Sequence, residues 1–370
     1  MTRYRDLGLS VGQLPPGPRN AITDVAGVTV SMTTLVDGDG PLRVGEGPIR
    51  TGVTVIVPHS RIRDEPVFAG CHRLNGNGEL TGLEWVRESG QLTTPVAITN
   101  THSVGVVRDA LVAADVRHRD DATAFWSLPV VGETYDGALN DINGMHVRAE
   151  HVFAALDAAG PEVPEGNVGG GTGMICHDFK GGTGTSSRVA NGWTVGALVQ
   201  ANYGRRERLT VAGVPVGEEI PTTEVSSAWD DAEALGTGSI IVILATDAPL
   251  LPHQCERLAQ RATLGIARAG GAGEHSSGDL FLAFATGNAG KLRTYKAHRD
   301  PAPFDVTMLP DNEMSDLFWA AIEAVEESIL NALVAAETLT GRDGITARAL
   351  PHDRLVEIMT RYGRGPATAA

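Results

Sequence analysis

A serine stands between a glycine-containing lead and a strongly apolar run in GTGSIIVILATDAPL, residues 236–250. The run 240–245 holds four β-branched residues, one leucine and one alanine, which is typical of a buried strand. Gly238 has no Cβ, so its backbone can reach strained conformations in which the Ser239 hydroxyl approaches the preceding carbonyl carbon. The pattern predicts a chain that can cleave itself between Gly238 and Ser239.

Such a cleavage would leave Ser239 as a new N-terminus. Its α-amine would have an ordinary pKa of about 7.7 to 8 and could act as the general base for its own hydroxyl. Enzymes with an N-terminal threonine nucleophile likewise use its α-amine as the general base. A glycine–serine pair before a strand is also a common turn, and the dipeptide alone leaves that alternative open.

A second group of polar residues is expected beside this serine. Residues 250–267 carry apolar side chains at helical spacing, and residues 278–285 (GDLFLAFA) read as another buried strand. If the two strands of this strand–helix–strand unit pair in parallel, their N-terminal ends share one sheet edge. Ser277 and Asp279 would then lie next to Ser239.

The remaining pattern mixes strands and helices without a linker between domains. We expect a single α/β domain over residues 1–370, built as a sandwich of sheets covered by helices. Strands are expected at 52–58, 95–100, 128–131 and 195–201, with a strand or hairpin at 21–34. Helices are expected at 80–89, 104–112, 150–159, 315–339 and 352–362.

Composition narrows the possible partners. The chain has 370 residues, 42% of them hydrophobic and 20% charged, as expected for a soluble globular protein. Its net charge of −15 argues against binding to nucleic acid or to an anionic membrane surface. We see no apolar run of membrane-spanning length and no secretory signal. The three widely spaced cysteines favour a reducing cytoplasm over a disulfide framework.

Several other motifs resemble phosphate-binding, catalytic-triad or metal-binding motifs, but their residues and spacing do not fit those functions. The glycine clusters at 169–173 and 181–184 lack the Lys-Ser/Thr ending of a phosphate-binding loop, so close backbone approach is the better explanation. His275, Ser277 and Asp279 are too close in sequence to form a Ser-His-Asp triad. The eleven histidines show no paired metal-ligand spacing. We therefore predict neither a metal nor a cofactor.

Taken in order, the motifs of this chain resemble one family. The chain is similar to the L-aminopeptidase D-alanine-esterase/amidases and β-aminopeptidases, which are self-processing serine hydrolases on an αββα-type sandwich shared with ornithine acetyltransferases. The matching segments cover most of the chain: RNAITDVAGVTV (19–30), RTGVTVIVP (50–58), LNGNGELTGLEWVRESG (74–90), AITNTHSVGVVRDA (97–110), VVGETYDGALNDING (130–144), VGGGTGMICHDFKGGTGTSSR (168–188), VQANYG (199–204), the Gly-Ser segment, SSGDLFLAFAT (276–286) and NALVAAETLTGRDG (331–344).

The resemblance implies a role for each matching position. It makes Gly238–Ser239 the self-cleavage site and Ser239 the nucleophile, supported by Ser277 and Asp279. Aspartate stands at position 279 where the best-known members carry glutamate. The resemblance also assigns Tyr135 and Asn202 to the oxyanion pocket. It makes Glu133 the carboxylate that binds the free amino group of the substrate.

These residue types also make chemical sense without the family. The Asn202 amide could face a developing oxyanion at the end of a strand, and Glu133 could bind a cationic amine. The sequence alone also allows a purely structural role for each residue: a strand-ending turn for Asn202, packing for Tyr135, a solvated position for Glu133 and a turn hydroxyl for Ser277.

We therefore expect a serine aminopeptidase or amidase that cleaves itself into residues 1–238 and 239–370. It would release N-terminal amino acids from short peptides, amides or esters through an acyl-enzyme on Ser239. The resemblance also implies a homo-oligomer, a tetramer of cleaved units. Two alternatives remain at this stage: an acyltransferase of the ornithine acetyltransferase type, and an unprocessed, non-catalytic binding protein.

Overall fold

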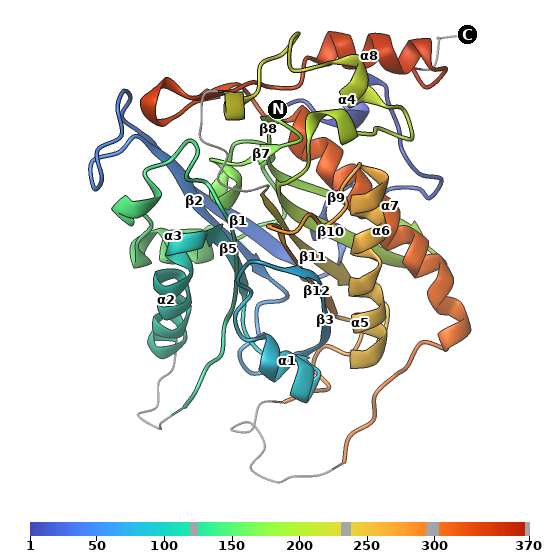
Figure 1. Ribbon diagram of the computed structural model, residues 1–370. Coiled ribbons are helices and arrows are strands. Elements are labelled where there is room, and N and C mark those ends of the chain that lie inside the picture. Colours follow the sequence, from blue (N-terminus) through green and yellow to red (C-terminus); the bar gives the residue numbers. More distant parts are fainter. Residues whose placement is uncertain (119–124, 231–237, 294–302, 367–370) are drawn as a thin grey trace.

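Two β-sheets lie face to face, and each carries helices on its outer side (Figure 1). The structure is a computed structural model that describes residues 1–118, 125–230, 238–293 and 303–366. In Figure 1, α2 (Val104–Arg117) and α3 (Ala149–Asp157) lie on one side of the sheets. On the other side lie α5 (Pro252–Gln260), α6 (Ala262–Arg268) and α7 (Met314–Val334). The expected αββα sandwich is confirmed.

The first sheet has four strands in the order β1-β2-β5-β6. Their bounds are Thr29–Asp37, Ile49–Val57, Val96–Asn100 and Val130–Thr134. The β1–β2 and β2–β5 pairs are antiparallel, whereas β5 and β6 run parallel. Val53 and Val55 pack with Val107 and Leu111 of α2, so the outer face of this sheet is sealed by apolar contact.

The second sheet has six strands in the order β4-β3-β12-β11-β10-β9. Their bounds in that order are Gln91–Leu92, Val67–Gly76, Gly278–Ala285, Ser239–Thr246, Trp193–Asn202 and Gly182–Ala190. β11 and β12 pair in parallel, with Ile240 opposite Asp279, as the strand–helix–strand pattern predicted. The other pairs of this sheet are antiparallel.

The unbroken apolar run of β11 has a simple cause, because both faces of this strand are buried. Ile241 and Ile243 point into the core between the two sheets. Ile240, Val242 and Leu244 belong to the core between the second sheet and its helices. All five side chains are completely buried, and each such burial stabilises the fold by about 1.5–3 kcal/mol.

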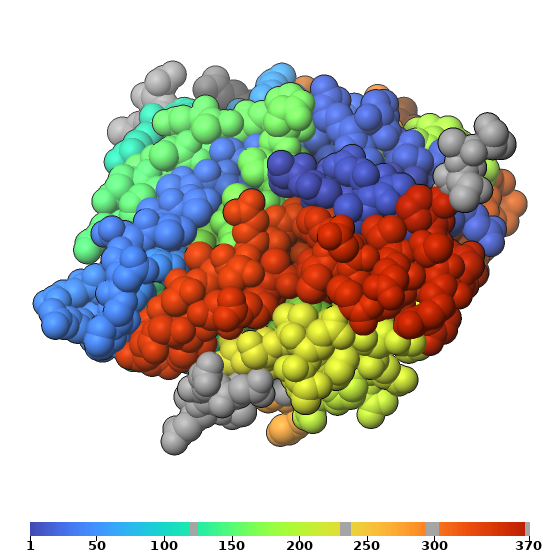
Figure 2. All heavy atoms as spheres, turned by 90° about the horizontal axis from the view of Figure 1, so that it is seen from above, coloured from blue at the N-terminus to red at the C-terminus, as the bar shows by residue number. Residues whose placement is uncertain are grey.

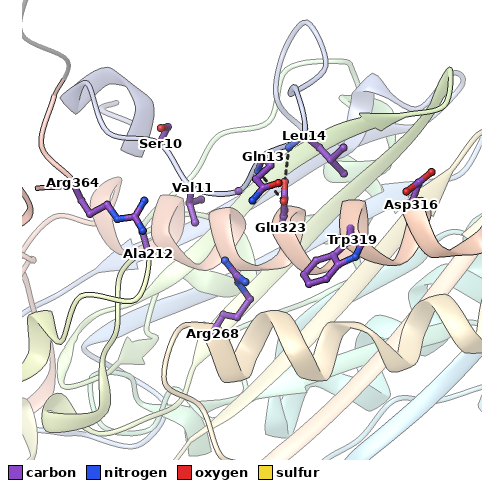
Figure 3. A pocket seen from close by; sticks show the side chains of 11 residues that line it. Ser10, Val11, Gln13, Leu14, Ala212, Arg268, Asp316, Trp319, Glu323 and Arg364 are labelled. Atoms are coloured by element: carbon purple, nitrogen blue, oxygen red, sulfur yellow. Dashed lines mark hydrogen bonds between the residues drawn. The ribbon is translucent and has the colours of Figure 1, made fainter.

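The N-terminal segment is attached to α7 through charged and polar groups. The backbone N–H groups of Gln13 and Leu14 donate to the Glu323 carboxylate at 2.8 and 2.9 Å (Figure 3). Arg188 of β9 is fully buried and pairs with Glu323 and with Glu327, its Nη2 lying 2.6 Å from Glu327 Oε2. In the space-filling view, the N-terminal residues lie against the C-terminal part of the chain (Figure 2).

Shorter elements complete the chain. They are α1 (Leu83–Ser89), β7 (Ile175–Cys176), β8 (Phe179–Lys180), α4 (Val216–Glu219), β13 (Leu339–Thr340), β14 (Thr346–Ala347) and α8 (His352–Arg361). The three cysteines are free and buried. No helix in the described ranges combines the length and the apolar character that crossing a membrane needs.

The structure departs from the sequence expectations at several elements: the helix expected at 315–339 ends at Val334, and the helix expected at 104–112 continues to Arg117. β3 and β9 were not predicted as strands, and the single helix expected at 250–267 is divided into α5 and α6 at Arg261. The second glycine cluster leads into β9, where α7 lies so close that a Cβ on Gly184 would be 1.9 Å from the Ser328 carbonyl oxygen. Close backbone approach is therefore confirmed there. The lead residues 231–237 lie outside the described residues.

Candidate active site

Ser239 occupies the first position of β11, between two neighbouring strands. In the antiparallel pair it lies opposite Asn202, the last residue of β10. In the parallel pair with β12, the next residue, Ile240, lies beside Asp279. The ends of three central strands thus bring Ser239, Asn202 and Asp279 to one edge of the second sheet.

The Ser239 hydroxyl lies within hydrogen-bonding distance of the start of β12. The Gly278 backbone N–H donates to Ser239 Oγ at 2.9 Å. Next to it, Ser277 Oγ donates to Asp279 Oδ1 at 2.6 Å. Burial raises the pKa of Asp279 to about 6, although the hydrogen bond from Ser277 acts in the opposite direction. A carboxylate with this pKa can change its protonation state near neutral pH, which suits a group that supports a nucleophile.

Gly238 has a backbone that a larger residue could not copy. Its φ is +33°, and a Cβ at this position would lie 1.6 Å from the carbonyl oxygen of Asn202. Both the dihedral angle and the close approach require glycine. The backbone that precedes Ser239 therefore packs against the end of β10 in a conformation that favours glycine and leaves no space for a side chain.

The Asn202 side-chain amide is held at both ends. Its Oδ1 accepts the Ile175 backbone N–H at 2.7 Å, and its Nδ2 donates to the Tyr135 carbonyl at 3.0 Å. Because Ile175 requires an acceptor, the oxygen and nitrogen of the amide have a defined orientation. The Nδ2 group has two hydrogens, and the Tyr135 carbonyl takes one of them.

Tyr135 contributes its backbone carbonyl rather than its hydroxyl to this contact. The phenol folds back over the next turn, where a Cβ on Gly137 would lie 2.4 Å from the hydroxyl oxygen. Burial raises the pKa of the phenol, and nearby Arg342 opposes that shift. The oxyanion role expected for the Tyr135 hydroxyl remains a prediction.

Glu133 lies at the end of β6 and approaches the site from the first sheet. Its Oε1 accepts the Glu79 backbone N–H at 2.9 Å, and its Oε2 accepts the Thr101 hydroxyl. Only 3% of Glu133 is exposed, and burial raises its pKa. A buried carboxylate with this environment is a good partner for an ammonium group that is desolvated on binding.

Two glycines bring Glu133 close to Ser239. A Cβ on Gly78 would lie 3.0 Å from Glu133 Oε1 and 3.2 Å from the Gly278 Cα. Gly278 in turn donates its N–H to Ser239. Gly78, Gly278 and Thr101 were not predicted as site residues, because no local pattern marks them; only their occurrence in the family-like segments could have indicated their role.

A cleft of about 740 Å³ opens at this edge of the sheet. Its lining includes Ile175, Asn202, Trp229, Gly238 and Ser276. Within the described ranges, no group of three or more His, Cys, Asp or Glu side chains is arranged to hold a metal ion. Of the site residues described above, Asn202 lines this cleft, whereas Ser277 and Asp279 line a second cleft of about 250 Å³ that shares Tyr203 and Gly204 with it. The hydrogen bonds and close contacts at the start of β11 bring together a serine, a serine–aspartate pair, an oriented amide and a buried glutamate.

Comparisons with known proteins place this arrangement in a family. Residues 20–347 match Peptidase family S58. The chain is 49% identical to beta-peptidyl aminopeptidase BapA of Sphingosinicella microcystinivorans, covering 98% of this chain and 93% of that protein. These matches confirm the family resemblance noted in the sequence.

Solved structures agree with this result. A beta-aminopeptidase from a Burkholderia species superposes with a TM-score of 0.90 at 53% identity, covering 100% of both chains. The L-aminopeptidase D-Ala-esterase/amidase of Ochrobactrum anthropi, described as a variant of the Ntn hydrolase fold, superposes with a TM-score of 0.89 at 46% identity, covering 98% of this chain and 99% of that one. These relatives are aminopeptidases, and they do not favour the acyltransferase alternative. The chain therefore belongs to Peptidase family S58 and is a serine aminopeptidase of the Ntn hydrolase fold.

Proposed function

We propose that Ser239 is the nucleophile of this aminopeptidase and that the chain generates it by cleaving its own Gly238–Ser239 bond. The observation that carries the proposal is the position of the Ser239 hydroxyl. It lies at the start of a buried strand, 2.9 Å from the Gly278 N–H and beside the Ser277–Asp279 pair, directly after a glycine with φ +33°.

Cleavage follows from attack by the Ser239 hydroxyl on the carbonyl of the preceding residue. Ser239 Oγ adds to the Gly238 carbonyl carbon, the hydroxyl proton passes to the Ser239 nitrogen and the peptide C–N bond breaks, which leaves an ester and a free α-amine. Water then hydrolyses the ester to the Gly238 carboxylate and restores the Ser239 hydroxyl. The products are residues 1–238 and 239–370.

The cleaved enzyme would use the same hydroxyl on its substrate. The Ser239 α-amine takes the hydroxyl proton as Oγ attacks the scissile carbonyl, and that proton passes to the leaving amine. The Ser277–Asp279 pair supports the nucleophile and its amine, and Asn202 Nδ2 donates to the oxyanion. Water hydrolyses the acyl-enzyme and releases the amino acid.

Glu133 would bind the free amino group of the substrate, which explains why only N-terminal residues are removed. We include N-terminal β-amino acids among the accepted substrates, because relatives at 49% and 53% identity are named for β-amino substrates. A panel of α- and β-aminoacyl anilides tests this choice. Absence of turnover with every β-aminoacyl member would refute it.

The two pieces should remain together after cleavage. The second piece supplies β11 and β12, which lie inside the six-stranded sheet between β10 and β3 of the first piece. Both flanking ladders therefore join the fragments. We further propose a cytoplasmic homo-oligomer, a tetramer of cleaved units, which light scattering on the purified protein would test.

Mass spectrometry of freshly made protein tests the central proposal. The wild-type chain of 38.8 kDa should appear as two fragments, with the second beginning at Ser239. Ser239→Ala should remain a single inactive chain. Ser226→Ala removes an exposed serine upstream of the cleaved bond and should cleave and hydrolyse normally. Two normal fragments from Ser239→Ala would refute the assignment.

A further inference from the structure

Lys180 is a fully buried lysine whose ammonium contacts backbone carbonyls. Its Nζ lies 2.7 Å from the Met174 oxygen, 2.8 Å from the Gly181 oxygen and 3.5 Å from the Gly171 oxygen. Its relative exposure is 0%. Burying an ammonium is costly unless its surroundings stabilise it, so a lysine in this position calls for an explanation.

The strongest of these contacts leads to the candidate oxyanion donor. Met174 O, which accepts from Lys180, and Ile175 N, which donates to Asn202 Oδ1 at 2.7 Å, belong to the same peptide group. The ammonium thus holds one end of a planar unit whose other end orients the Asn202 amide. The Gly181 N–H also donates to Met174 O at 2.9 Å, which fixes the plane further.

This series of hydrogen bonds from Lys180 to Asn202 has an electrostatic consequence. A positive charge at a carbonyl oxygen polarises the peptide and strengthens its N–H as a donor, and bonds in series reinforce one another in a buried setting. The same polarisation continues into the Asn202 amide and makes Nδ2 a better donor to negative charge. Lys180 does so without touching a reacting atom.

We propose that Lys180 is a positioning residue that orients and polarises the oxyanion donor Asn202 through the Met174–Ile175 peptide. This inference rests on the proposed function, because it assumes that Asn202 stabilises the oxyanion. It assigns a task to a charge that the catalytic steps do not use directly.

A double-mutant cycle with Lys180→Met and Asn202→Ala tests the inference. The readout is kcat for cleaved protein and the first-order rate of self-cleavage for any variant that emerges uncut. Lys180→Met should lower kcat, or the self-cleavage rate of an uncut variant, about tenfold to hundredfold with little change in KM. Loss of a whole oxyanion donor costs roughly 10²- to 10³-fold. Because Lys180 acts through Asn202, the double variant should be no slower than Asn202→Ala alone.

The outcomes distinguish a failure of the role proposed for Asn202 from a failure of the role inferred for Lys180. If Asn202→Ala keeps the wild-type rate, the proposed role of Asn202 fails. If Asn202→Ala is slow but the two effects multiply, Lys180 acts independently and only the present inference is overturned. Lys291→Met removes an exposed lysine as a matched control and should leave kcat unchanged.

The pH dependence gives a readout that a purely structural lysine would not affect. Burial lowers the pKa of Lys180 to about 7, and the Cys176 thiol, which burial keeps neutral, faces it from β7. The ratio of wild-type to Lys180→Met kcat cancels the titration of other groups. This ratio should fall as pH rises through about 7, and a constant ratio would contradict the inference.

A measurement on the unsubstituted enzyme covers the case in which Lys180 variants fail to fold. With ¹⁵N-labelled asparagine, the Asn202 side-chain amide is identified as the signal absent from Asn202→Ala. Its shift should titrate with a midpoint near 7, where Lys180 loses its proton. A signal that stays constant from about pH 5.5 to about pH 9, a range that spans this midpoint, would overturn the inference.

Discussion

Gly238→Ala separates self-cleavage from peptide hydrolysis. The added Cβ would lie 1.6 Å from the Asn202 carbonyl oxygen. Restoring a normal contact of about 3.5 Å requires a relative movement of about 2 Å. The alanine must also leave the positive φ of +33° or accept a cost of about 1–2 kcal/mol.

The consequence for the reaction follows from geometry. Attack by Ser239 Oγ needs the carbonyl carbon at roughly 3–3.5 Å, and a misplacement of about 1 Å can cost 10²-fold in rate. Because Gly238→Ala demands a larger shift of the adjacent backbone, we expect self-cleavage to slow by at least about 100-fold. The residue is no longer joined to Ser239 after cleavage, so whatever cleaved fraction forms should hydrolyse substrate with nearly normal kcat.

A time course of freshly translated protein on a denaturing gel, with active-site titration of the cleaved fraction, measures both effects. Gly213→Ala is the matched control, because Gly213 has φ +81° but open space around its Cβ position. This control should lower Tm and cleave at the normal rate. Cleavage of Gly238→Ala at the wild-type rate would refute the argument that the backbone at this position prepares the bond.

Three further results are expected. First, the pKa of Asp279 is raised to about 6, and its ionised form supports Ser239, so the self-cleavage rate should increase with pH through a midpoint near 6; an equal rate at pH 5 and pH 7 would argue against this role. Second, Glu133→Gln should raise KM for aminoacyl anilides by about 10- to 100-fold, because a charge-assisted hydrogen bond worth about 1.5–3 kcal/mol is lost, while self-cleavage, which uses no substrate amine, continues; an unchanged KM would contradict the assignment. Third, Arg188→Met should reduce unfolding stability by about 1.5–3 kcal/mol in denaturant titration, because two glutamates on α7 lose a buried cationic partner while Glu323 keeps its backbone donors and Glu327 keeps Arg5. The exposed pair of Arg43 provides the comparison, and Arg43→Met should change stability by less than about 1 kcal/mol.

The local pattern predicted the centre of the fold well. The continuous apolar run of β11 and the similar run of β12 are buried on both faces, and burial of that kind leaves a signal in consecutive residues. The parallel pairing of these strands follows from the helical segment between them. Ser239, Ser277 and Asp279 could therefore be expected at one sheet edge.

Two strands left no such signal. β9 (GTGTSSRVA) is almost entirely buried yet contains few apolar residues, because its polar side chains find partners inside the protein. Ser186 Oγ donates to the Ala324 carbonyl on α7 at 2.6 Å, and Arg188 pairs with glutamates of the same helix. β3 (VFAGCHRLNG) interrupts its apolar residues with two glycines and with His72, Arg73 and Asn75, so it shows no continuous apolar run. Neither composition indicates a buried strand until the partners of its polar side chains are known.

The sequence by itself determined the family, the sandwich fold and the strand that begins at Ser239, because burial patterns and motifs are written in neighbouring residues. Only the tertiary structure decided how the Asn202 amide is oriented, where Glu133 rests, and what Lys180 contacts. Each of these depends on backbone N–H or carbonyl groups of another segment, such as Ile175 for Asn202 and Glu79 for Glu133. Every residue type carries those groups, so their positions are set by the folded path of the chain.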